Sequence, residues 1–166
     1  LPLPDARNEV GQVTSRLALA TFGYTNYFDR CREIPDGLDR LAGLAFEVVE
    51  TERQRVGRTL TDLERARAIE SHLRDSREYV YSLSVPSSSP GIDPVEDFLF
   101  TRRAGHCQYF ASALGLMLRS VGIPARLVTG FKGGEQRSDG LLYVEKRFAH
   151  AWVEAWIDDG KWVLVK

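Results

Sequence analysis

Apolar residues recur every three or four positions in three stretches of the chain, which is the spacing of helices with one buried face. In the first stretch we expect Asp36 to cap the helix and Gly57 to end it. In the second, Thr61 and Glu64 have the spacing of a capping box. The third stretch follows Gly105. The three stripes are Leu38, Leu41, Ala45 and Val48; Leu63, Ala66, Ile69 and Leu73; and Cys107, Phe110, Ala111, Leu114, Met117, Leu118 and Val121.

Strand-like segments rich in β-branched and aromatic residues dominate the last third of the chain. A simple hairpin between the last two strands places Ile157 opposite Trp162. A short strand over 79–83 and a contribution from 17–27 are predicted earlier, and Pro94 begins a brief helix. Helices first and an antiparallel sheet last indicate an α+β fold. The predicted C-terminal strands cover 125–131, 141–146, 148–157 and 162–165, with a glycine-rich loop over 132–140.

The composition fits one globular domain, 1–166, with an N-terminal helical and irregular part (1–60) and a core (61–166). The 22 basic and 23 acidic residues give a formal charge of -1, so we expect no nucleic-acid partner. No apolar run reaches the roughly 18 residues that span a bilayer, so we expect no membrane insertion by this segment. The first residue is not Met, and we expect the chain to be part of a larger protein.

The two cysteines, Cys31 and Cys107, lie in different contexts, and we do not expect them to form a disulfide. The three histidines are dispersed, and no Cys/His group has the spacing of a zinc site. We therefore expect no metal and no cofactor.

Cys107 carries the first sign of chemistry, because it stands at the predicted start of a helix directly after Gly105 and His106. The unpaired N–H groups and positive end of a helix favour the reactive thiolate, and the same N–H groups can hold an oxyanion. The helical stripe turns this thiol toward the interior, where the sheet is expected.

His150 carries the second sign, on the alternating strand 148–157. A thiol at a helix N-terminus that faces an imidazole on an antiparallel strand is activated by the imidazole, which later protonates the leaving amine. Its face of the strand also holds Trp152, Glu154 and Trp156, while Ala149, Ala151, Val153 and Ala155 point the other way.

Each of these residue types also has a purely structural interpretation. An isolated Cys is more often a packing residue than a nucleophile, which is how we interpret Cys31. His72 is expected to be solvated on a charged helix face, and His106 to brace the turn beside Cys107 or to have a further role. The three tryptophans are more often core than substrate wall.

The stretches 93–100, 103–113, 122–131 and 150–156 together resemble the bacterial branch of the transglutaminase-like superfamily. This resemblance implies a papain-like α+β transglutaminase core, with Cys107 as the nucleophile and His150 as its base. It also implies cysteine-dependent acyl transfer or amide hydrolysis on a protein or peptide substrate through a thioester. It does not choose between amine and water as the acceptor.

The chain departs from the family pattern at the third catalytic position. The family carries an Asp four residues after a Trp, whereas Lys166 follows Trp162 at that spacing. Glu154 shares the face of His150 but lies four residues along the strand, about 13 Å away. The alternative function is therefore a weakly active or inactive binding domain.

The resemblance also favours an extracytoplasmic location in a membrane-anchored bacterial protein.

Overall fold

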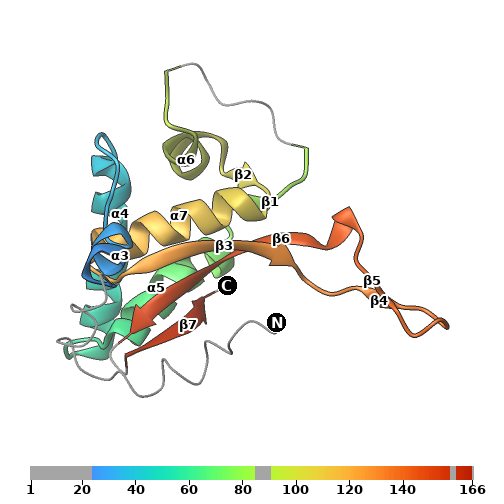
Figure 1. Cartoon of the computed structure of the whole chain (residues 1–166). Helices are drawn as coiled ribbons and strands as arrows, with labels where there is room; N and C mark the ends of the chain where they lie inside the picture. Colours follow the sequence, from blue (N-terminus) through green and yellow to red (C-terminus); the bar gives the residue numbers. More distant parts are fainter. Residues whose placement is uncertain (1–23, 85–90, 158–159, 166) are drawn as a thin grey trace.

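The computed structural model describes residues 24–84, 91–157 and 160–165. Its centre is helix α7, Cys107–Ser120, which packs against a sheet on one side and against α4, Asp39–Val56, and α5, Asp62–Asp75, on the other (Figure 1). The shorter elements are α3 Tyr24–Arg30, β1 Val80–Tyr81, α6 Pro94–Asp97, the π-helix η1 Phe98–Arg102, β2 Ala104–Gly105 and the 3-10 helix η2 Lys146–Phe148.

The main sheet has the strand order β3-β6-β7, and both of its pairings are antiparallel. Its outer strands, β3 and β7, are therefore its edges, and the central strand carries His150. Two further strands form a small hairpin that projects from one end of the sheet (Figure 1). The strands are β3 Ala125–Phe131, β6 Ala149–Ile157, β7 Lys161–Val165, β4 Glu135–Gln136 and β5 Leu142–Tyr143.

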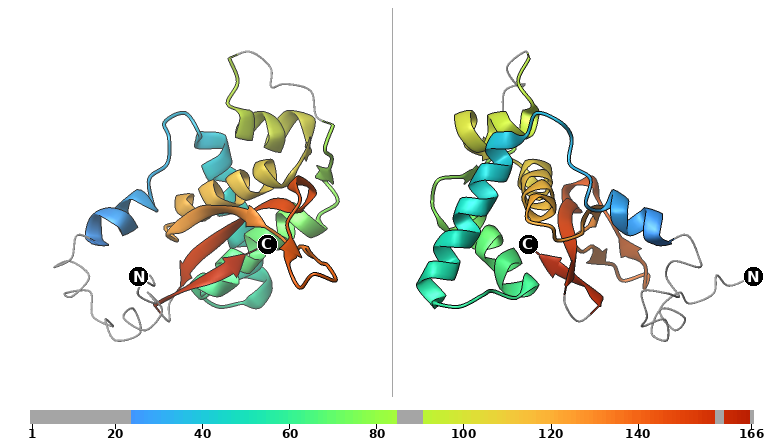
Figure 2. Two further views of the ribbon diagram at one scale, coloured as in Figure 1. Left: turned by 45° about the vertical axis from the view of Figure 1, so that its right-hand side comes forward. Right: turned by 90° about the vertical axis from the view of Figure 1, so that its left-hand side faces the viewer.

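Figure 2 shows the layers from two further directions, with α7 between the sheet and the pair α4–α5. The buried face of α7 includes Met117 and Leu118, which are fully buried. It meets the face of β6 formed by small residues, since a Cβ built on Gly115 would lie 3.8 Å from Val153 Cγ2. These observations confirm the mixed α+β fold expected from the sequence.

Local signals in the sequence place several helix ends correctly. The capping box is present, because Glu64 N–H donates to Thr61 Oγ1 over 3.2 Å and Thr61 N–H donates to Glu64 Oε2 over 2.9 Å. Gly57 ends α4 with a left-handed φ of 76°. Asp93 accepts hydrogen bonds from the first turn of α6, which begins at Pro94.

Other boundaries differ from those expected. Asp36 does not cap α4, because the helix begins at Asp39 and its N-cap position is Leu38. The stretch predicted as a strand over 17–27 is helical from Tyr24 onward, and its remaining part lies outside the described residues. The strand expected over 79–83 contracts to the two residues of β1.

The C-terminal strands also differ in extent and register. The loop predicted over 132–140 contains β4, while the strand predicted over 141–146 contracts to β5. Trp162 pairs with Trp156, and Ile157 pairs with Lys161, so the hairpin register is one residue from the one expected. The connection includes Gly160, whose φ of 71° suits glycine and whose N–H donates to the carbonyl of Ile157.

Candidate active site

A cavity of about 420 Å³ opens where the N-terminal end of α7 meets the sheet. Cys107 and His150 both line it, although they are 43 positions apart in the sequence. Most of the remaining wall is apolar or aromatic. The other lining residues are Glu70, Leu73, Arg74, Tyr79, Tyr81, Phe110, Ala111, Leu114, Ala151, Trp152, Val153 and Val165.

Cys107 is the first residue of α7, and its side chain is half-buried. The N-cap is His106, whose Nδ1 accepts a hydrogen bond from Gln108 N–H over 3.4 Å. The Cys107 N–H has no hydrogen-bond partner among the described residues. This unpaired N–H lies beside the thiol. It can therefore donate a hydrogen bond to the oxyanion that forms when the thiolate attacks a carbonyl carbon.

The turn before Cys107 is held by close packing. A Cβ added to Gly105 would lie 2.8 Å from Cβ of Tyr109, so only glycine allows this approach. The turn begins at Arg103, which adopts a left-handed φ of 51°. Its carbonyl, and that of Gly105, accept hydrogen bonds from the N–H groups of Val80 and Ser82 in the β1 segment. The path of the chain into α7 is therefore fixed on both sides.

A buried ion pair stabilises the turn before Cys107. Asp97 is fully buried, and its Oδ2 lies 2.8 Å from Nε of Arg102. The guanidinium of Arg102 also lies over the ring of Tyr109, 5.3 Å from its centroid. Because Tyr109 packs against Gly105, the ion pair acts on the segment that carries Cys107.

His150 lies near the start of β6, opposite Gly130 on β3. Its ring is stacked on that of Trp152, with centroids 6.5 Å apart and planes 26° apart. The Trp152 ring extends across the strand, because a Cβ on Gly130 would lie 2.9 Å from Cη2 of the indole. The glycine therefore makes room for the tryptophan that lines the cavity.

α7 does not pack on the face of β6 that carries His150. Ala151, Val153 and Ala155 face the helix and are buried. The opposite face is partly covered by Phe28 of α3, whose ring lies 4.8 Å from that of Trp156. The histidine reaches the cavity of Cys107 at the beginning of the strand.

Glu70 and Arg74 are cavity residues that the sequence interpretation missed. Glu70 is buried on α5, and its two carboxylate oxygens accept hydrogen bonds from Arg67 and Arg74 over 2.7 and 2.8 Å. Glu70 follows Ala66 by four residues and precedes Leu73 by three, so its position on the buried stripe was visible in the sequence. Leu63, by contrast, was assigned to that stripe and is exposed.

The other two histidines, His72 and His106, have structural roles. His72 was expected to be solvated, but it is half-buried, its Nε2 lies 3.4 Å from the hydroxyl of Tyr79, and burial lowers its pKa. Burial likewise raises the pKa of the Tyr79 hydroxyl, which therefore stays neutral. His106 braces the start of α7, which is one of the roles left open for it.

The other candidate groups lie apart from the cavity wall. Cys31 is buried and its carbonyl accepts from Ala125 N–H, consistent with a packing residue. Both cysteines are free thiols. Glu154 pairs with Arg126 of β3 over 2.5 Å. Lys166 lies outside the described residues.

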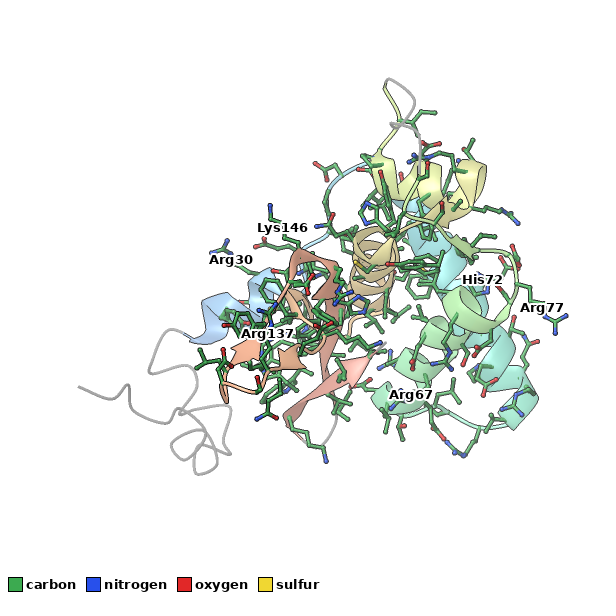
Figure 3. All side chains as sticks on the ribbon, turned by 90° about the vertical axis from the view of Figure 1, so that its right-hand side faces the viewer. Arg30, Arg67, His72, Arg77, Arg137 and Lys146 are labelled. Atoms are coloured by element: carbon green, nitrogen blue, oxygen red, sulfur yellow. The ribbon has the colours of Figure 1, made fainter. Side chains whose placement is uncertain are left out.

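Residues 24–84, 91–157 and 160–165 contain no group of three or more His, Cys, Asp or Glu side chains placed to hold a metal ion. The same residues contain no helix long and apolar enough to cross a bilayer. Basic side chains such as Arg67 on α5 and Arg137 on the hairpin lie on separate parts of the surface (Figure 3).

The fold defines the class of this protein: it is a papain-like α+β domain in which one helix packs across an antiparallel sheet. The profile of the transglutaminase-like superfamily matches residues 50–166. The chain belongs to the transglutaminase-like superfamily.

The relatives of this chain include curated proteins and solved structures. A protein-glutamine gamma-glutamyltransferase of Pseudomonas aeruginosa is 44% identical over 88 residues, which cover 52% of this chain and 13% of the relative. The uncharacterized protein YebA of Bacillus subtilis is 32% identical over 146 residues, covering 82% and 18%. The crystal structure of the periplasmic domain of TgpA from Pseudomonas aeruginosa superposes with a TM-score of 0.69 at 33% identity, covering 82% of this chain and 45% of that chain. The chain thus spans less than a fifth of the length of these curated relatives.

Proposed function

We propose that this domain is a cysteine-dependent acyltransferase or amidohydrolase in which Cys107 is the nucleophile and His150 is its general base and acid. The observation that carries the proposal is the shared cavity: a thiol at the first position of a helix and an imidazole from the central strand line one cavity. The family membership and the glutamyltransferase relative support the same chemistry.

The reaction starts with proton transfer from the Cys107 thiol to His150. The thiolate attacks the carbonyl carbon of a carboxamide or peptide bond, and the negative charge moves to the carbonyl oxygen, beside the Cys107 N–H. Collapse of this intermediate breaks the C–N bond, and the imidazolium gives its proton to the departing ammonia or amine. An amine or a water molecule then resolves the thioester, with His150 accepting the proton of the attacking group.

The substrate is proposed to be a protein or peptide, because the cavity is lined largely by apolar and aromatic side chains and opens to solvent beside exposed residues of β1. No step in this scheme requires a metal or an organic cofactor.

The similarity to the periplasmic domain of TgpA supports an extracytoplasmic location. Protease treatment of spheroplasts and of lysed cells tests the location, since an extracytoplasmic domain is cut in both and a cytoplasmic domain is cut only after lysis.

Trapping of the covalent intermediate tests the proposal. The protein is incubated with a glutamine-containing peptide and no amine, quenched in acid and analysed by intact-mass spectrometry and peptide mapping. The expected result is a peptide adduct, less one ammonia, on Cys107, and no adduct in Cys107→Ala. An adduct on Cys31, or the same adduct yield in Cys107→Ala, would overturn the assignment.

A second candidate function is a catalytically silent domain that binds a peptide or cell-wall component. The observation that favours it is Lys166, which stands where the family pattern has an Asp. The acid of such a triad orients and stabilises the imidazolium, and its loss lowers turnover by up to about four orders of magnitude.

The substitution Lys166→Asp separates the two functions. If the dyad is intact and lacks only the acid, Lys166→Asp raises amine incorporation into a glutamine peptide above the level of the unchanged chain. Lys161→Asp, at the first position of β7, is a control with the same change of charge. A silent binding domain shows no turnover in either variant and no faster alkylation of Cys107.

A further inference from the structure

The segment that forms β1 has one strand edge that the described part of the chain leaves unpaired. β1 and β2 form a two-stranded parallel sheet, and no other described strand pairs with β1. The N–H groups of Val80 and Ser82 both donate toward β2, over 2.8 and 2.9 Å. Because successive residues of a strand direct their N–H and C=O groups to opposite edges, the N–H and C=O of Tyr81 point away from β2.

This edge adjoins the candidate active site. The side chain of Tyr81 lines the cavity of Cys107 and His150, and its ring centroid lies 6.3 Å from that of Phe110, also in the cavity wall. The residues around it are apolar but exposed: Val80 is 60%, Tyr81 56% and Leu83 81% exposed. An unpaired edge with exposed apolar side chains is a template for another strand.

We propose that the free edge of β1 binds the acyl-donor peptide as an added strand. The N–H and C=O of Tyr81 hydrogen-bond to the backbone of an extended peptide, and an apolar residue of that peptide next to the acyl donor enters the cavity beside Tyr81 and Phe110. The proposal deepens the function proposed above and rests on it. It makes Tyr81 a substrate-binding residue that acts mainly through its backbone.

The continuity of this edge with the cavity selects a substrate peptide as the occupant. A peptide held along β1 extends directly into the cavity that Cys107 lines, because Tyr81 of β1 is itself part of the cavity wall. Backbone pairing gives affinity without a fixed sequence, and the aromatic wall adds a preference for apolar neighbours.

The substitution Tyr81→Pro tests the backbone contact. Proline removes the N–H that β1 does not use and leaves the donors of Val80 and Ser82 in place, and it is tolerated on strand edges. Tyr81→Ala is the matched control, because it also removes the ring but keeps the N–H. Both are made in Cys107→Ala, so that peptide binding is measured without turnover.

The probe is a fluorescein-labelled peptide in which one glutamine is flanked by valine and leucine, with binding followed by anisotropy. We expect Tyr81→Pro to bind it about three- to tenfold more weakly than Tyr81→Ala, the size of one lost hydrogen bond. Equal binding by the two variants would overturn the proposal. So would self-association of the chain that Tyr81→Pro abolishes without any change in peptide binding, because the edge would then pair with a second copy.

A peptide variant covers the case in which Tyr81→Pro does not fold. N-methylation of the probe at successive residues removes its donors one at a time, and weaker binding at a single position next to glutamine is expected. Uniform binding across the series would contradict strand addition. The trapping experiment distinguishes failure of this proposal from failure of the proposed function. If no Cys107 adduct forms but peptide binding still depends on Tyr81, the strand-addition site is supported and the proposed acyl-transfer chemistry is rejected.

Discussion

At the scale of single residues, two glycines that allow close approaches shape the site. Gly105 admits Tyr109 beneath the turn before Cys107, and Gly130 admits the indole of Trp152 beside His150. In each case a methyl group would lie under 3.0 Å from its neighbour, which is Cβ of Tyr109 or Cη2 of Trp152, so that neighbouring residue has to move. The positions of the thiol turn and of the cavity wall therefore depend on residues that have no side chain.

Gly130→Ala is expected to displace Trp152 and to destabilise the fold by about 1–2 kcal/mol, the usual cost of overpacking. Tryptophan fluorescence and thermal unfolding measure the two effects, and turnover of a peptide substrate falls. Gly115→Ala is the control, because its new methyl group would lie 3.8 Å from Val153, an ordinary contact, within a helix that gains up to about 1 kcal/mol. Similar effects from both substitutions would contradict the role of Gly130.

The ion pair of Asp97 and Arg102 is expected to contribute far more to the free energy of unfolding than an exposed pair of similar length. Asp97→Asn leaves the charge of a nearly buried arginine uncompensated and should cost about 3 kcal/mol. It should also slow alkylation of Cys107, because the pair supports the preceding turn. Glu78→Gln breaks the exposed pair with Arg103, 2.7 Å long, and should cost less than about 1 kcal/mol. Equal losses in a denaturant titration would show that burial is not the deciding factor.

At the scale of elements, the start of α5 is set by its capping box, which lies at the surface. Thr61→Ala removes the acceptor of the Glu64 N–H and is expected to lower the free energy of unfolding by about 1 kcal/mol. Thr51→Ala, at an exposed position inside α4, keeps every cap and should have little effect or a slightly stabilising one. Chemical denaturation of both variants tests this, and a Thr51 variant as unstable as the Thr61 variant would contradict it.

Acid should weaken the same helix end. The hydrogen bond from Arg58, followed by the one from the Thr61 backbone, lowers the pKa of Glu64 to about 2. A carboxylate with a depressed pKa contributes stability that is complete above its ordinary pKa of 4.5 and is lost as the pH falls toward about 2. Glu64→Gln should therefore flatten the fall of the melting temperature between about pH 4.5 and 2. Parallel curves for the two proteins would contradict the contribution of Glu64.

The sequence predicts the elements whose signals are local and repeated. The apolar stripe of α7, the capping box and the alternation of β6 each involve several residues at fixed spacing, and all three appear in the structure. The elements that the sequence predicts incorrectly depend on contacts between residues far apart in the sequence, or on a single turn. The helix from Tyr24 is stabilised by Phe28 against the tryptophans of β6 and β7, and the register of Trp156 with Trp162 is set by the turn.

The candidate site is predictable to a similar extent. The sequence predicts Cys107 and His150, because a helix start and an alternating strand give each side chain a direction, and both residues line the cavity. The far wall was not predicted, since Glu70, Tyr79 and Tyr81 come from segments whose approach to α7 depends on the tertiary packing of α5. A charged residue at a buried helical position, as at Glu70, was the available signal.

At the scale of the whole molecule, the packing of α7 between two helices and the sheet brings together groups from the middle and the end of the sequence. The packing of α7 on the sheet determines where Cys107 lies relative to the sheet. The pairing of β6 with β3 and β7 determines where His150 lies. The proposed chemistry therefore requires that Cys107 and His150 act as a pair.

The alkylation rate of Cys107 in the unchanged protein and in His150→Ala, measured with iodoacetamide at about pH 7 and about pH 9.5, tests this pair most directly. An ordinary thiol ionises near pH 8.5, so an accessible cysteine is mostly thiolate at the higher pH with or without an imidazole. We expect His150→Ala to slow alkylation of Cys107 strongly at about pH 7 and little at about pH 9.5, while Cys31, read from the same digest, stays slow in both proteins. Equal rates for Cys107 at about pH 7 with and without His150, or a rate no faster than that of Cys31, would contradict this expectation.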